Sequence, residues 1–197
     1  MRKRKEKKTD NSNLSAKLAL RRYFLRKYHA DGSARVLDCT EGEGIIWNRL
    51  RKEGPVQSYL GLDKKERRGG LTIDSRKVLA NPRIEQDVID IDTYGSPWKH
   101  VIALMRHRQK PVTVFLTFGD AGIAGPGDAG LLDLLGMSAL ITGGGIGPAL
   151  MGKIGRALLE EGLARLQTDT LKIVDAKEAK SANARYIGLR FDEKKSR

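Results

Sequence analysis

Short runs of apolar residues alternate with stretches of helical periodicity along most of this chain. The runs have the length of strands, and turn residues such as glycine, proline or aspartate follow most of them. They predict strands at residues 34–38, 58–63, 71–73, 87–92 and 112–118. The patterns between them predict helices at residues 45–52, 75–80 and 97–108. Such alternation is typical of a doubly wound α/β domain, with a parallel sheet covered by helices on both faces.

The two ends of the chain differ from this pattern. Residues 1–12 are polar and charged without apolar periodicity, so we expect a disordered basic tail there. A helix is expected over residues 13–29, with Asn13 or Ser15 as its cap. A glycine-rich segment is expected at residues 119–149, with a short helix at 129–137 inside it. A longer helix is expected at 148–166, followed by two closing strands at 171–175 and 184–191. We therefore predict one domain over residues 13–192 and a short tail at 193–197.

Aspartates stand at the ends of several predicted strands. Right-handed crossovers place the carboxyl ends of parallel strands at one edge of a sheet. The four acids concerned are Asp38, Asp63, Asp74 and Asp92. We expect them to converge on one crevice at that edge, which is where doubly wound sheets bind their ligands.

The composition is that of a soluble globular protein, with 40% apolar and 31% charged residues. No apolar run approaches the ~20 residues that a membrane span needs, so we expect no membrane partner. Cys39 is the only cysteine, which excludes an intrachain disulfide and fits a reducing, cytoplasmic setting. The three histidines are scattered along the chain, and no metal site is predicted.

The charge is strongly positive and unevenly distributed. The net charge is +13, and the first thirty residues hold eleven Lys and Arg against two acids. A concentrated basic end favours a polyanionic partner, nucleic acid first. The candidates for phosphate contacts lie on the helix expected at 13–29, and they are Arg21, Arg22, Arg26 and Lys27. The alternative is a solvated helix face without a partner.

The stretch VLDCTEGEG at residues 36–44 joins a strand end to a glycine turn and a helix start. Gly42 and Gly44 would let the backbone pass close to a ligand, so the stretch predicts a nucleoside-type cofactor. Asp63, at the end of the next strand, could accept hydrogen bonds from ribose hydroxyls. Dehydrogenases of the NAD class also place an acid there, so these residues alone leave the cofactor open.

Residues 90–97, DIDTYGSP, form the most informative stretch. Asp90 and Asp92 alternate on a predicted buried strand and share one of its faces, which is costly unless the two acids are used. An aromatic residue, Tyr94, and a glycine follow at once. Asp90 is a candidate for either a hydrogen-bonded supporting role or a direct catalytic role, and the supporting role is favoured.

The order of these residues resembles a class I S-adenosylmethionine (SAM)-dependent methyltransferase over roughly residues 34–120. Within it, DIDTYGSP resembles the catalytic segment Asp-x-Asp-Pro-Phe-Gly-Ser-Pro of the tRNA guanine exocyclic-amine dimethyltransferases. Thr40 departs from the usual first glycine of the loop, and Thr93 replaces the usual proline. The chain is also far shorter than those tRNA enzymes.

The resemblance implies a Rossmann-like, mostly parallel sheet of seven strands and SAM as the cofactor, and the basic helix expected at 13–29 would be an extra element before this fold. It implies that Asp63 holds the ribose and Asp74 the adenine, while Asp38 orients the glycine loop near the amino-acid end of the cofactor. The cofactor-binding residues expected on this basis are Asp38, Thr40, Glu41, Gly42, Gly44, Asp63 and Asp74.

The resemblance also implies that Asp92 is the catalytic acceptor and that Tyr94 stacks on a base. The lone pair of an exocyclic amine is conjugated with its ring, and a carboxylate that accepts from the NH₂ group localises it. We therefore expect N-methylation of a nucleic-acid base, with tRNA or other RNA favoured over DNA. A protein or small-molecule amine, a non-catalytic nucleic-acid-binding protein and an NAD-type oxidoreductase are the alternatives.

Overall fold

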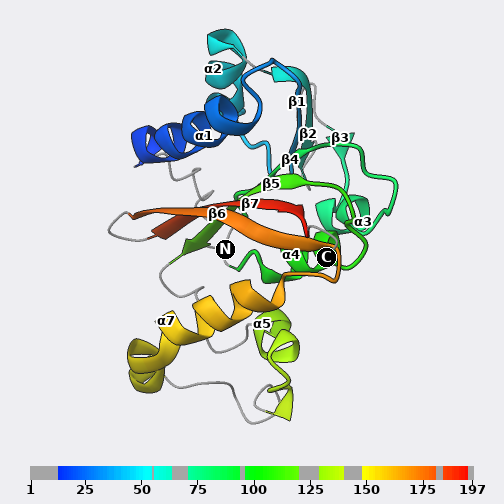
Figure 1. Cartoon of the computed structure of the whole chain (residues 1–197). Helices are drawn as coiled ribbons and strands as arrows, with labels where there is room; N and C mark the ends of the chain where they lie inside the picture. Colours follow the sequence, from blue (N-terminus) through cyan, green and yellow to red (C-terminus); the bar gives the residue numbers. More distant parts are fainter. Residues whose placement is uncertain are drawn as a thin grey trace, which may run out of the picture.

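The computed structural model describes residues 13–54, 56–63, 71–93, 96–119, 129–139, 148–180 and 184–194 (Figure 1). Helices and strands alternate through most of the chain, as the apolar pattern predicts. In chain order they are α1 (Leu14–Tyr28), β1 (Ala34–Asp38), α2 (Ile45–Glu53), β2 (Val56–Asp63), β3 (Leu71–Thr72), α3 (Ser75–Leu79), β4 (Val88–Ile91), α4 (Trp98–Met105), β5 (Val112–Gly119), α5 (Ala129–Leu134), α7 (Pro148–Arg165), β6 (Leu171–Lys180) and β7 (Ala184–Glu193).

The strands form one seven-stranded sheet in the order β3-β2-β1-β4-β5-β7-β6. The neighbours from β3 to β5 are parallel, and β7 runs antiparallel to both β5 and β6. The expected doubly wound, mostly parallel sheet is therefore confirmed. The chain winds outward in both directions from β1 and β4, so the ligand crevice is expected at the carboxyl ends of these two strands.

Helices cover both faces of the sheet (Figure 1). One apolar cluster joins α1 and α2 to the first face, with Phe24 and Trp47 at its centre. The larger cluster lies on the other face, where Trp98 is fully buried and packs edge-on against Phe118. Trp98 is therefore a core residue, although it follows the DIDTYGSP stretch directly.

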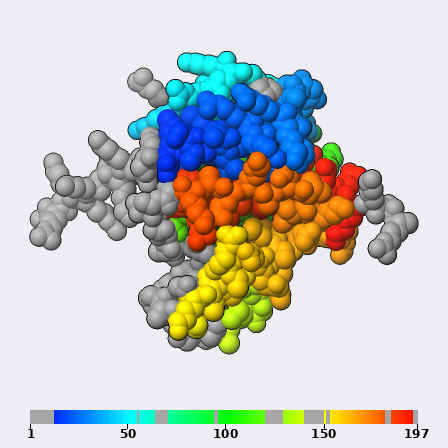
Figure 2. Space-filling model, turned by 60° about the vertical axis from the view of Figure 1, so that its left-hand side comes forward, coloured from blue at the N-terminus to red at the C-terminus, as the bar shows by residue number. Residues whose placement is uncertain are grey.

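Helix α1 is an integral part of this domain. Figure 2 shows it lying along β6 and β7, and Phe24 packs closely on Gly188 of β7. A Cβ atom at position 188 would lie 2.4 Å from the Phe24 ring, so glycine is needed there for the helix to approach. Asn13 stands at the cap position of α1 without a side-chain cap bond.

The structure departs from the sequence pattern mainly at element ends. Strand β6 continues to Lys180, beyond the predicted end at residue 175, because charged residues are compatible with an exposed edge strand. Strand β7 includes Glu193, and the amide of Lys194 donates to the Thr170 carbonyl, so the tail begins later than predicted. The tail at 1–12 and most of the glycine-rich segment lie outside the described residues. No helix in the described ranges is long and apolar enough to span a membrane.

Candidate active site

Four aspartates lie at or just after the carboxyl ends of the parallel strands. Asp38 ends β1, Asp63 ends β2, Asp74 precedes α3 and Asp92 follows β4. In the sheet register, Asp38 pairs with Gly61 on one side and with Asp90 on the other. Asp38 and Asp90 therefore lie side by side at the point where the sheet order reverses.

The glycine loop between β1 and α2 takes the conformation that its sequence predicts. Gly42 and Gly44 have φ angles of +56° and +65°, in the left-handed region that favours glycine. Gly44 is also the N-terminal cap residue of α2. The amide of Glu41 donates to the Leu62 carbonyl over 2.8 Å, which fixes the loop against β2.

Asp38 is buried beneath this loop. Its carboxylate accepts from the Thr40 amide and from the Tyr59 hydroxyl, each over 3.1 Å. Burial, followed by the nearby charge of Asp90, raises the pKa of Asp38 well above its usual range. The Thr40 hydroxyl donates to the Asp92 carbonyl over 2.7 Å, so the residue that replaces the usual glycine joins the loop to the end of β4.

Glu41 supplies a buried oxygen that lacks a partner. Its Oε2 atom has no hydrogen-bond donor among the described residues. The carboxylate lies against Gly61, where an added Cβ would come within 2.4 Å of the Glu41 side chain. A buried carboxylate oxygen without a donor is costly, so this position suits a ligand that carries N–H or O–H groups.

The other two acids differ in their surroundings. Asp63 is half-buried at the end of β2, and its carbonyl accepts from the Ile73 amide. Asp74 caps α3 by accepting from the Arg76 amide, and it forms an ion pair with the Arg76 side chain over 2.6 Å. Asp74 therefore has a local structural role, whether or not a ligand also uses it.

Asp90 is enclosed by donors and is 2% exposed. Arg21 donates to both of its oxygens over 2.7 Å, and Trp47 Nε1 donates to Oδ2 over 2.7 Å. Burial opposes the charge on Arg21, but the Asp90 carboxylate outweighs it and raises the pKa of the guanidinium. The structure thus places Asp90 in a supporting position, as favoured from the sequence. The prediction that Arg21 contacts nucleic acid is wrong, because this side chain is buried against Asp90.

Asp92 lies two residues further and is more open. Lys17 Nζ donates to its Oδ2 over 2.5 Å, and the side chains of Lys17 and Asp92 are 7% and 21% exposed. The ammonium also lies 5.1 Å from the centre of the Tyr186 ring. Four residues of a helix rise ~6 Å and two residues of a strand ~6.6 Å, so Lys17 and Arg21 match Asp92 and Asp90. Lys17 is not among the site residues predicted from the sequence, and the one signal for it there is the pair of cations spaced one helical turn apart.

Two of the other cations predicted for nucleic acid pair with acids of neighbouring elements. Arg22 binds Glu53 and Lys27 binds Asp175, over 2.6 and 2.7 Å. The Asp175 hydrogen bond, followed by those with Tyr23 and Tyr28, raises the pKa of Lys27 above its usual range. Arg26 is exposed. Tyr94 lies outside the described residues.

Solved structures with this architecture cover nearly the whole chain. Trm1 from Pyrococcus horikoshii, in complex with S-adenosyl-L-methionine, matches with a TM-score of 0.62 and 16% identity over 91% of this chain and 54% of that one. The plantazolicin methyltransferase BamL, in complex with a triazolic desmethylPZN analogue and SAH, matches with a TM-score of 0.51 and 10% identity over 94% and 88%. This chain has the class I methyltransferase fold.

Solved structures that are not named as methyltransferases also match this fold. A proposed hemolysin from Lactococcus lactis matches with a TM-score of 0.59 and 11% identity over 96% of this chain and 90% of that one. No family model matches the sequence, and no curated protein matches it significantly. The chain spans about half the length of the Pyrococcus structure. The likeness therefore establishes the methyltransferase fold, and the chemistry depends on the site.

Proposed function

We propose that this protein is a SAM-dependent methyltransferase that methylates an exocyclic amine of a nucleic-acid base, with RNA favoured. The observation that carries the proposal is the position of Asp92. Its carboxylate is partly exposed at the carboxyl end of β4, and its backbone carbonyl is bound by Thr40 of the glycine loop. A carboxylate that could accept from an amine thus stands beside a loop suited to a nucleoside cofactor.

The residues at the sheet edge fit SAM. Asp38 and the unpartnered oxygen of Glu41 could accept from amino or hydroxyl groups, and both lie by the glycine loop. Asp63 would bind the ribose and Asp74 the adenine amino group, while Gly42 and Gly44 let the backbone approach. The Pyrococcus structure, a tRNA dimethyltransferase with SAM, supports this assignment.

Bound at this edge, SAM would supply an electrophilic methyl group. Asp92 would accept a hydrogen bond from the amine, localise its lone pair and stabilise the positive charge that develops on nitrogen. Lys17 would hold Oδ2 of Asp92, so that Oδ1, which has no donor among the described residues, faces the amine. Asp90, fixed by Arg21 and Trp47, would keep the end of β4 in place.

The net charge of +13 supports nucleic acid as the substrate. A base inside a duplex would have to be flipped out or be unpaired already to reach Asp92. DNA, a protein amine and a small-molecule amine are alternative substrates that the same carboxylate could serve.

The proposal is tested first on the cofactor and then on the substrate. Calorimetry should show binding of SAM but not of NAD, and absence of SAM binding would refute the proposal. Methyl transfer from labelled SAM is then measured on total RNA and on DNA. Asp92→Ala should retain SAM binding and lose transfer, whereas Asp192→Asn, at an acid of β7 that pairs with Arg190, should retain both. Transfer to DNA alone, or full activity of Asp92→Ala, would contradict the substrate or the catalytic assignment.

A further inference from the structure

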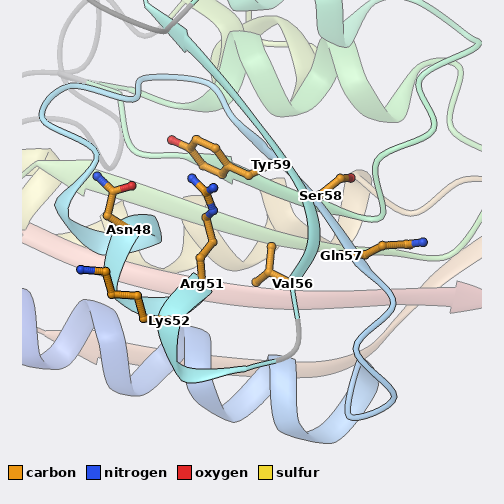
Figure 3. Close-up of a pocket in the computed structure, with 7 residues that line it drawn as sticks. All are labelled: Asn48, Arg51, Lys52, Val56, Gln57, Ser58 and Tyr59. Carbon is orange, nitrogen blue, oxygen red and sulfur yellow. The ribbon is translucent and has the colours of Figure 1, made fainter.

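A groove of about 410 Å³ opens between α2 and β2. Pockets for small ligands have volumes of this order. Figure 3 shows the guanidinium of Arg51 beside the ring of Tyr59, with the Asn48 amide on the same side. The residues that line the groove are Asn48, Arg51, Lys52, Val56, Gln57, Ser58 and Tyr59.

The groove is positively charged. None of its lining residues is acidic, and neither Arg51 nor Lys52 has a carboxylate partner among the described residues. Most cations of α1 differ, because Lys17, Arg21, Arg22 and Lys27 each form an ion pair with an acid, and only Arg26 has no ion-pair partner among the described residues. Uncompensated positive charge in a concave wall concentrates the field that attracts anions. The groove is therefore better suited to a polyanion than the surface of α1.

Its geometry suits a phosphate beside a sugar. The Arg51 guanidinium lies 5.2 Å from the centre of the Tyr59 ring, and such stacking orders a guanidinium while leaving its N–H groups free for a phosphate. The Asn48 amide, on the same side as Arg51 and Tyr59, adds a neutral polar group that could bind a ribose hydroxyl, whereas Gln57 and Ser58 point away from Arg51 (Figure 3). The Tyr59 hydroxyl donates to Asp38, so the groove borders the predicted cofactor site.

We propose that this groove binds the phosphate backbone of the RNA substrate a few nucleotides from the methylated base. The assignment rests on the proposed function, because it takes RNA as the substrate. Strand β1 alone separates β2 from β4, which gives a sideways offset of about two strand spacings, or ~10 Å. Through Val36, Tyr59 is level with Val88, four residues or ~13 Å along the strand before Asp92, so the edge of the groove lies ~16 Å from the end of β4. A single strand spans that separation with a few nucleotides. Ribose hydroxyls distinguish RNA from DNA at such a site.

The test measures binding of a short single-stranded RNA by fluorescence anisotropy at several salt concentrations. The double variant Arg51→Gln/Lys52→Gln should bind about tenfold more weakly at low salt. Its plot of log affinity against log salt should be shallower by about 1.4, since each phosphate contact on a single strand contributes about 0.7. The matched control is Arg49→Gln, an exposed cation of α2 outside the groove, which should retain the wild-type slope.

Four results would overturn the groove assignment. They are an unchanged slope in the double variant, absence of RNA binding by the wild type, tighter binding of a DNA of the same sequence, and competition by inorganic phosphate as strong as competition by RNA. SAM calorimetry on the same samples separates the two proposals. If the wild type binds SAM and the double variant binds RNA as tightly as the wild type does, the groove assignment alone is refuted. If the wild type does not bind SAM, the proposed function is refuted.

Discussion

Helix α1 directs two cations at two aspartates near the end of β4, and the two ion pairs differ in almost every other respect. Arg21 and Asp90 are 1% and 2% exposed, and three hydrogen bonds from Arg21 and Trp47 occupy both oxygens of Asp90. Lys17 and Asp92 are 7% and 21% exposed, and one described donor reaches the Asp92 carboxylate. Two acids of the same type, two positions apart, are thus divided into a closed pair and an open pair.

The difference shows how a strand end can support a reactive carboxylate. A charge buried with its full set of donors is held rigidly, and removal of one partner leaves the other uncompensated. A carboxylate with an unoccupied oxygen at a partly exposed edge can still accept from a substrate. The closed pair should therefore determine stability and the open pair activity, and the following variants test that division.

The largest effect is expected from Arg21→Met. It leaves the buried Asp90 carboxylate without its cation, so the free energy of unfolding should fall by about 3–5 kcal/mol. Urea denaturation followed by circular dichroism measures the loss. Arg21→Met/Asp90→Asn should recover much of it, because the amide is neutral and its oxygen can still accept from Trp47. A loss below about 1 kcal/mol would mean that Arg21 is not the main stabilising partner.

The second variant separates the two acids by function. Asp92→Asn should lower methyl transfer by about 100- to 1000-fold, because an amide stabilises developing positive charge poorly, and should cost ~1 kcal/mol or less in stability. Asp90→Asn should show the opposite pattern, with a stability loss of ~3 kcal/mol from the uncompensated Arg21. Initial rates with labelled SAM and urea denaturation on the same preparations make the comparison. Equal losses of rate at equal stability would abolish the distinction between the pairs.

Lys17 gives a smaller effect. Lys17→Met removes the hydrogen bond to Oδ2 of Asp92, so kcat should fall about tenfold, the worth of one charge-assisted hydrogen bond, with KM for SAM unchanged. Lys17→Arg should recover most of the rate, because it restores a cation there. Lys27→Met is the control on the same helix, since its ion pair with Asp175 lies away from the site. If Lys17→Met retains its rate, or if Lys27→Met loses as much, Lys17 does not position Asp92.

The sequence predicted the sheet well and the two pairs only in part. Apolar runs locate the parallel strands, and topology then places Asp38, Asp63 and Asp92 at one edge. Periodicity cannot pair Lys17 or Arg21 with an acid, because their partners lie 75 and 69 positions away. A cation on an amphipathic helix is expected to face solvent. The end of β6 was not predicted because its charged residues suggested a loop, although they are also compatible with an exposed edge strand. The proposed role of Tyr94 stays a prediction.

The smallest effect concerns Asp38, which lies beside Asp90 in the sheet. Asp38 has no ion-pair partner of its own among the described residues. The pKa of Asp38 is raised in the folded protein. The contribution of Asp38 to the free energy of unfolding is therefore complete below its pKa in the unfolded chain, about 3.9, and is lost as the pH rises through its pKa in the folded protein. Asp38→Asn stays neutral at every pH. Its melting temperature should match that of the wild type near pH 4 and exceed it by about 3 °C at pH 7. Scanning calorimetry across this range, with Asp192→Asn as control, measures the difference. A gap that does not change with pH would show that Arg21 compensates Asp38 as well as Asp90, and the closed pair would then be a three-residue cluster.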